Sequence, residues 1–140
     1  VINEGGEAIG VIPRFLEAKE VAHSRLTRLH VVDTMHARKA LMAELSDGFI
    51  VLPGGWGAFD ETFEILTWAQ LGLHQKPCGM LNVRGYYDRL LSFMEHAVAE
   101  GFVNPRCRQL LTVSTEPDTL LDALAAFEAP FIDKVADAKG

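Results

Sequence analysis

The segment of this chain with the clearest chemical potential is residues 52–61, Leu-Pro-Gly-Gly-Trp-Gly-Ala-Phe-Asp-Glu. Glycines at positions 54, 55 and 57 let the backbone turn tightly and approach a ligand without a Cβ in the way. An apolar strand pattern precedes the segment and a helical pattern follows it, so the free N–H groups and the positive dipole end of a helix lie behind the glycines. The segment therefore predicts an anion site that suits phosphate.

The spacing of these glycines limits what the site can bind. It lacks the six-residue GxGxxG pattern of dinucleotide-binding loops and the Lys-Ser/Thr ending of a P-loop. Neither NAD nor ATP is indicated, and the loop suits the single phosphate of a small monophosphate ligand. From the loop alone, Gly54 and Gly55 could equally serve a tight turn with no ligand.

The charged and aromatic residues nearby are each open to two interpretations. We expect Asp60 and Glu61 in the first turn of the helix, where they either complement the dipole or take part in chemistry. Arg38 is either a ligand-binding residue or a solvated helix residue. Trp56 either stacks on a planar base or covers the loop.

Hydrophobic periodicity, helix-capping residues, and the glycines and prolines that end helices and strands predict the elements that position these residues. Residues 14–28 are polar and of mixed sign, which predicts a loop with a short helix that is long enough to act as a lid. We also expect the end of a helix at residues 1–4, which two glycines terminate, and a short turn at 104–108. We expect strands at 8–12, 29–32, 48–52, 78–83 and 110–113, and helices at 35–45, from the glycine loop to 72, at 85–100 and at 116–127.

Short apolar strands that alternate with helices predict an α/β fold, a Rossmann-like doubly wound parallel sheet with helices on both faces. We expect a single domain over residues 1–128 and a tail at 129–140. Ligands of such sheets bind outside the carboxyl ends of the strands. That rule places Arg38, Lys39 and residues 54–61 on one rim.

Composition excludes several classes of function. The 140 residues are 49% hydrophobic and 23% charged, as in one ordinary globular domain. A net charge of −6 and no Lys/Arg cluster argue against nucleic acid or an anionic membrane as partner. No apolar run approaches the roughly 18 residues of a membrane span, and no signal peptide opens the chain, so we expect a cytoplasmic protein. Cys78 and Cys107 form no CxxC pair, so we expect reduced thiols, no metal and no cofactor.

Several segments together resemble the Lonely Guy (LOG) family, whose members share an Arg-Lys pair followed by a PGGxGTxxE motif and include many formerly labelled possible lysine decarboxylases. The resemblance covers nearly all of residues 1–128. It implies a phosphoribohydrolase that cleaves the N-glycosidic bond of a cytokinin riboside 5′-monophosphate, or of AMP, to the free base and ribose 5-phosphate. The matching segments are Met35-His36-Ala37-Arg38-Lys39, residues 52–61, Thr67-Trp68-Ala69-Gln70-Leu71-Gly72 and Gly85-Tyr86-Tyr87.

Carried onto this sequence, the resemblance implies that Arg38 and Glu61 are the catalytic pair. A carboxylate near the ribose can stabilise the oxocarbenium character of the transition state and orient or deprotonate water, and a guanidinium can hold the phosphate or the ribose hydroxyls. Met35 and Lys39 are further candidates to line the site. The resemblance also implies a homodimer with the active site at the dimer interface. The family's phosphate-binding loop corresponds here to Gly54, Gly55, Trp56, Gly57 and Ala58.

The sequence departs from the family pattern in three respects. Ala58 stands where Thr is usual, which removes a hydroxyl that could bond phosphate, and Asp60 stands where Glu is common. The family's N-terminal portion, which resembles two further strands and a GGGxxGLM loop, does not appear in these 140 residues. We therefore expect them to be part of a longer protein whose sheet includes those strands.

Three other functions stay open at the level of sequence. A carrier of the same fold would bind a phosphorylated ligand or cofactor without cleaving it. A pyridoxal-phosphate decarboxylase would need a Schiff-base lysine near a phosphate site, for which Lys19, Lys39 and Lys76 offer no supporting context. Because Ala58 replaces the usual Thr, the sequence also leaves open that this chain is an inactive relative of the family's enzymes. The sequence does not decide which base is preferred.

Overall fold

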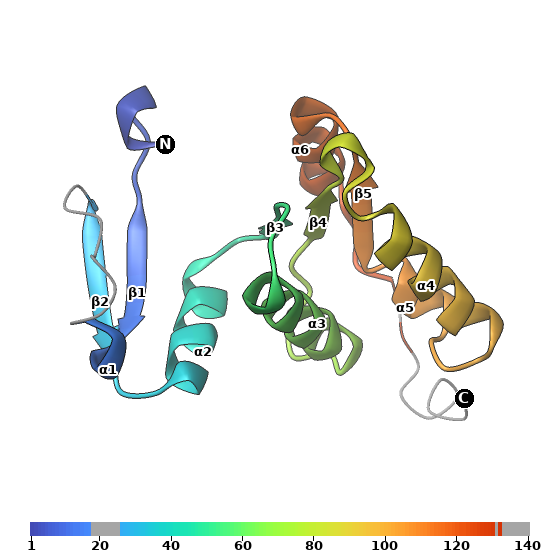
Figure 1. Ribbon diagram of the computed structural model, residues 1–140, viewed down its shortest axis with the longest axis horizontal. Coiled ribbons are helices and arrows are strands. Elements are labelled where there is room, and N and C mark those ends of the chain that lie inside the picture. The colour runs from blue at the N-terminus through green and yellow to red at the C-terminus, as the bar shows by residue number, and fades with distance from the viewer. Residues whose placement is uncertain (18–25, 131, 133–140) are drawn as a thin grey trace. The chain divides into compact units, whose positions relative to one another are not determined.

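The computed structural model describes residues 1–17, 26–130 and 132. It divides into two compact units, residues 1–46 and 47–140, and each is described by itself. Both are α/β units with parallel strands (Figure 1). The α/β class that the sequence predicts is confirmed.

The first unit is a pair of parallel strands with a helix packed on them. Strands β1 and β2 pair from Ile9 opposite Arg28 to Pro13 opposite Val32, and α2 packs against both. Pro13 is the last residue of β1, because proline has no N–H with which to continue the ladder. The elements of the first unit, in order, are η1 (Ile2–Glu4), β1 (Ile9–Pro13), α1 (Arg14–Glu17), β2 (Arg28–Val32) and α2 (Met35–Leu45).

Helix α2 agrees with the prediction at both ends. The side chain of Thr34 accepts a hydrogen bond from the N–H of Ala37 at 3.0 Å, so Thr34 is the N-cap that starts the helix. The lid expected at residues 14–28 falls largely on residues 18–25, outside the described residues. Of that stretch, helix α1 and residues 26–28 are described, and Arg28 is the first residue of β2.

The second unit is built on a three-stranded parallel sheet in the order β3-β4-β5 (Figure 1). Its elements, in order, are β3 (Phe49–Val51), α3 (Trp56–Gln70), β4 (Cys78–Leu81), η2 (Val83–Gly85), α4 (Asp88–Ala99), α5 (Pro105–Arg108), β5 (Leu111–Ser114) and α6 (Pro117–Ala125). Glycines with positive φ follow α3 and α4, as expected: Gly72 has φ 70° and Gly101 has φ 81°.

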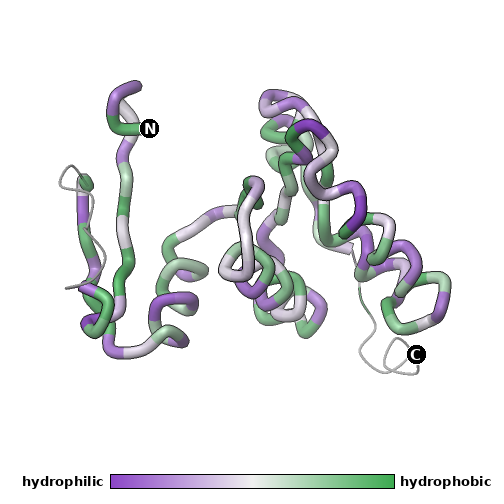
Figure 2. Tube along the Cα trace, in the orientation of Figure 1, coloured by the Kyte–Doolittle hydropathy of each residue, from purple (hydrophilic) through white to green (hydrophobic). Residues whose placement is uncertain are grey.

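Helices cover both faces of this sheet. Alternate strand residues point to opposite faces, and Cys78 and Met80 point into a core that includes Tyr87 and is contacted by α3 and α4. On the opposite face a Cβ on Gly79 would lie 2.9 Å from Leu120 of α6, so glycine lets this helix pack directly on the strand. Figure 2 shows hydrophobic and hydrophilic residues alternating along α3 and α4, as in helices that bury one face.

Two expectations about this unit are wrong. Helix α4 begins at Asp88 rather than at Gly85, because Arg84 (φ 51°) and Gly85 (φ 71°) adopt left-handed conformations that interrupt helical hydrogen bonding. The apolar positions of a helix over 85–100 put Tyr86 and Phe93 on its inner face, but these two side chains are 53% and 64% exposed. Leu90, Leu91 and Met94, on the same predicted face, are partly buried against the core.

The predicted parallel strands form two small sheets in the described part of the chain. Among the described residues, backbone hydrogen bonds form one ladder of two strands and another of three. Periodicity identifies strands, but the neighbour of each strand depends on tertiary pairing.

Candidate functional site

The glycine loop connects β3 to α3 and leaves the N-terminus of α3 open. Gly55 is the N-cap and offers no side-chain acceptor, so the first N–H groups of the helix have no partner from the cap. A Cβ on Gly55 or on Gly57 would meet no atom within 4 Å. The end of the helix can therefore be approached closely by an anion.

The position of α3 corrects two expectations about the site. The helix begins at Trp56, so Gly57 lies in its first turn rather than in the loop. Asp60 and Glu61, expected in that first turn, lie in the second, and the first turn contains no acidic residue. Because the dipole effect falls off within the first turn, complementing the dipole does not account for Glu61.

Glu61 shares a helix face with the open first turn. It is four residues after Gly57 and three after Ala58, the spacings that place side chains on one face. Helical side chains tilt toward the N-terminus, so the half-buried carboxylate of Glu61 lies over the turn that carries the glycine. It makes no hydrogen bond or ion pair with another described residue. This geometry places a carboxylate one turn from the open N-terminus of the same helix.

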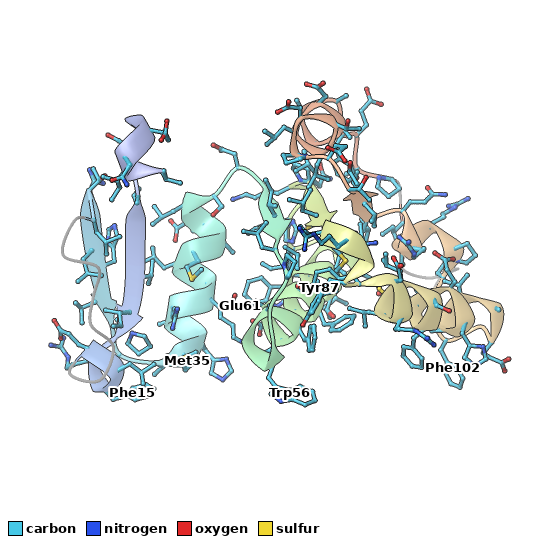
Figure 3. All side chains as sticks on the ribbon, turned by 45° about the horizontal axis from the view of Figure 1, so that its top comes forward. Phe15, Met35, Trp56, Glu61, Tyr87 and Phe102 are labelled. Atoms are coloured by element: carbon cyan, nitrogen blue, oxygen red, sulfur yellow. The ribbon has the colours of Figure 1, made fainter. Side chains whose placement is uncertain are left out.

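Trp56 lies at the start of the same helix and is 87% exposed. Its ring contacts Phe59 edge-on, with centroids 6.0 Å apart. Figure 3 shows Trp56 projecting away from α3. The indole therefore does not cover the glycine loop, and stacking on a ligand base stays a prediction.

The other predicted site residues lie on α2 in the first unit. Met35 is 37% exposed at its first position, and Arg38 and Lys39 are half-buried in its second turn. The Nε of Arg38 is buried and has no hydrogen-bond partner among the described residues. A buried donor without an acceptor costs about 1–3 kcal/mol, so Arg38 is suited to receive an acceptor from a ligand. The pairing of Arg38 with Glu61 stays a prediction.

Two residues at the loop were missed by sequence reasoning. Tyr86 donates from its hydroxyl to the carbonyl of Gly54, and Tyr87 donates to the carbonyl of Leu52, each at 2.7 Å. The tandem tyrosines after Gly85 were visible as part of the family resemblance, but Tyr86 was interpreted as helix packing.

His74 has a backbone hydrogen-bond partner at each ring nitrogen. Its Nδ1 accepts from the N–H of Lys76 at 3.1 Å, which leaves Nε2 to donate to the carbonyl of Ile65 at 2.9 Å. The ring also packs against Phe49, with centroids 5.4 Å apart. Cys78 and Cys107 are buried free thiols.

Within the described ranges, no group of three or more His, Cys, Asp or Glu side chains could hold a metal ion. No helix in the described part of the chain is long and apolar enough to cross a membrane.

The model of the family described as "Possible lysine decarboxylase" matches residues 1–124. The chain belongs to this family, the Lonely Guy family of the resemblance above.

Named relatives support the same placement. The chain is 52% identical over 130 residues to the cytokinin riboside 5′-monophosphate phosphoribohydrolase of Rhodococcoides fascians, an alignment that covers 92% of this chain and 64% of that protein. It is 45% identical over 139 residues to a protein of the same name from Arabidopsis thaliana, which covers 99% of this chain and 65% of that protein. The chain thus spans just under two thirds of the length of these two relatives.

Proposed function

We propose that this protein hydrolyses the N-glycosidic bond of a nucleoside 5′-monophosphate, either a cytokinin riboside 5′-monophosphate or AMP. The products are the free base and ribose 5-phosphate. The observation that carries the proposal is the carboxylate of Glu61, which has no hydrogen bond or ion pair within the described part of the chain and lies on the face of α3 shared with Gly57 and Ala58 at the open end of the helix. The names of the two relatives support the same reaction.

In the proposed reaction the phosphate binds at the N-terminus of α3, where Gly55 and Gly57 admit close approach. The bond between C1′ and the base nitrogen breaks, its electron pair leaves with the base, and positive charge develops on the ribose. Glu61 stabilises that charge and orients or deprotonates the water that adds to C1′. The base nitrogen takes up a proton, so that one water molecule is consumed in each turnover.

Arg38 holds the phosphate or the ribose hydroxyls in this proposal. Its buried Nε lacks an acceptor within the described part of the chain, and the planar guanidinium fixes geometry as well as charge. Met35 and Lys39, on the same helix, line the site. Trp56 is available to stack on the base, because its ring is exposed.

We further propose that the protein acts in the cytoplasm as a homodimer without a nucleic-acid partner. The net charge of −6 opposes binding to polyanions, and the two buried thiols suit a reducing compartment. The dimer follows from the family resemblance.

The decisive experiment measures base release from AMP and from isopentenyladenosine monophosphate by the purified protein. We expect release by the parent protein and its loss in Glu61→Gln and in Arg38→Ala. Two variants serve as matched controls: Asp122→Asn changes an exposed carboxylate on α6, and Arg89→Ala changes an exposed guanidinium on α4. Both should retain activity.

Binding of a monophosphate without base release would favour the carrier instead. A decarboxylase would release carbon dioxide from lysine and show the absorbance of bound pyridoxal phosphate. Either result would contradict the proposed hydrolase.

A further inference from the structure

Two tyrosine hydroxyls hold the glycine loop from a distant part of the sequence. Tyr86 and Tyr87 donate to the carbonyls of Gly54 and Leu52, which lie 32 and 35 residues earlier in the chain. A loop that contains glycines has many accessible backbone conformations, and ordering it costs entropy. The two hydrogen bonds restrict this loop before any ligand arrives.

The bond to Gly54 has a direct consequence for anion binding. The peptide between Gly54 and Gly55 is planar and trans, so its N–H points opposite to its C=O. When Tyr86 holds the carbonyl of Gly54, the N–H of Gly55 is directed away from the tyrosines. That N–H makes no hydrogen bond to any other described residue.

The bond to Leu52 fixes the exit of the chain from β3. The next residue, Pro53, has no N–H and a fixed φ. Holding the carbonyl of Leu52 therefore restricts the only hydrogen-bonding group of the peptide between Leu52 and Pro53. Together the two tyrosines restrain the loop on both sides of Pro53.

Tyr87 is buried, and its backbone is connected to the sheet by hydrogen bonds. Tyr87 is 1% exposed, and its N–H donates to the Oδ1 of Asn82 at 2.8 Å. The Nδ2 of Asn82 donates to Asp88 at 2.7 Å, and its backbone N–H donates to the carbonyl of Ser114 in β5 at 2.8 Å. The loop is thus connected to the central sheet through buried polar groups.

The two tyrosines directly follow a turn whose residues, Arg84 and Gly85, have left-handed backbone conformations. Arg84 and Gly85 have φ values of 51° and 71°, and a Cβ on Gly85 would lie 2.5 Å from the Oδ2 of Asp88. The rings of Tyr86 and Tyr87 pack edge to face, with centroids 4.9 Å apart. Burial raises the pKa of Tyr87 above its usual 10.0, so its hydroxyl remains a donor at neutral pH.

We infer that Tyr86 and Tyr87 are positioning residues that preorganise the backbone of the glycine loop for the phosphate of the substrate. This inference rests on the proposed function, because it assumes that the loop binds phosphate. It assigns the tyrosines no contact with the substrate. Their effect acts through the carbonyls of Leu52 and Gly54.

The test compares Tyr86→Phe and Tyr87→Phe with the parent protein and with Thr67→Val. Each tyrosine variant keeps the ring and removes one hydroxyl. Thr67→Val removes a hydroxyl that donates at 2.7 Å to the carbonyl of Phe63 in α3, away from the loop. Tyr86 is 53% exposed, so its variant should fold normally even if Tyr87→Phe does not.

Three quantities are measured below the melting temperature of each variant: the Kd for ribose 5-phosphate, KM and kcat for AMP, and the inhibition constant of adenosine. For each tyrosine variant we expect the Kd and KM to rise by roughly threefold to tenfold, the effect of one lost hydrogen bond. The kcat should stay within about twofold, because one remote hydrogen bond is lost and no reacting group is changed. The inhibition constant of adenosine, which lacks a phosphate, should not change. Thr67→Val should match the parent protein in all three.

The outcomes separate this inference from the proposed function. If the parent protein binds ribose 5-phosphate and Tyr86→Phe binds it equally well, the positioning role is wrong and the proposed function stands. A purely structural role would lower the melting temperature without changing Kd or KM, which also contradicts the inference. If the parent protein neither binds ribose 5-phosphate nor cleaves AMP, the proposed function fails and the inference fails with it.

Discussion

A Cβ atom on Gly54 would lie 2.7 Å from the Cβ of Ala58, so the glycine loop and the third residue of α3 approach each other more closely than two side chains allow. Ala58 cannot move aside as the end of a long side chain would, because its Cβ is fixed to the helix backbone. The close packing of the loop on α3 therefore requires glycine at position 54.

Gly54→Ala should accordingly destabilise the protein by about 1–3 kcal/mol, the typical cost of overpacking. Urea unfolding would measure this loss. A double-mutant cycle with Ala58→Gly provides the control, because removing the opposing Cβ should restore part of the stability. Strict additivity of the two substitutions would show that the contact does not limit residue 54.

Gly57→Ala should have opposite effects on stability and on activity. Residue 57 lies in α3 with no atom near a Cβ, and alanine is favoured over glycine in a helix by up to about 1 kcal/mol. The melting temperature should rise or stay unchanged. The new methyl group would stand on the face that leads to Glu61, so KM for AMP should increase. An unchanged KM would show that the substrate does not approach across this face.

Ala58→Thr should strengthen binding of a monophosphate. It adds a hydroxyl at the third helical position, and one hydrogen bond to phosphate is worth about 0.5–1.5 kcal/mol or more. Ala58→Val is the matched control, because it has the same branched shape and a similar helix propensity but no hydroxyl. We expect a lower Kd for ribose 5-phosphate with Thr than with Val. Equal affinities would contradict a direct contact between residue 58 and the phosphate.

The thiol of Cys78 should make stability depend on pH in the alkaline range. Burial raises its pKa from 9.0 to about 11, so the folded protein keeps a proton that the unfolded chain loses above about pH 9. The resulting stabilisation is fully present below pH 9 and is lost as pH rises toward 11. A shift of this size corresponds to roughly 2–3 kcal/mol.

Cys78→Ala isolates this contribution. The free energy of unfolding of the parent protein should fall more steeply between about pH 9 and pH 11 than that of the variant. Parallel pH profiles for the two proteins would show that Cys78 does not ionise on unfolding in this range.

The sequence by itself determined the elements whose limits depend on neighbouring residues in the chain. Helix α2 starts after Thr34 because a side chain can cap a helix only within its first turn. Gly72 and Gly101 end helices because they adopt positive φ at low cost. The family was also evident from the sequence, because short motifs at fixed spacing carry it.

Tertiary structure decided which residues meet across the chain. The hydrogen bonds from Tyr86 and Tyr87 to the loop span 32 and 35 residues, and no periodicity specifies such a partner. Likewise, the two ladders of the sheets follow from pairing between distant strands. Local hydrogen bonds can be inferred from neighbours in sequence, whereas these contacts exist only once the chain has folded.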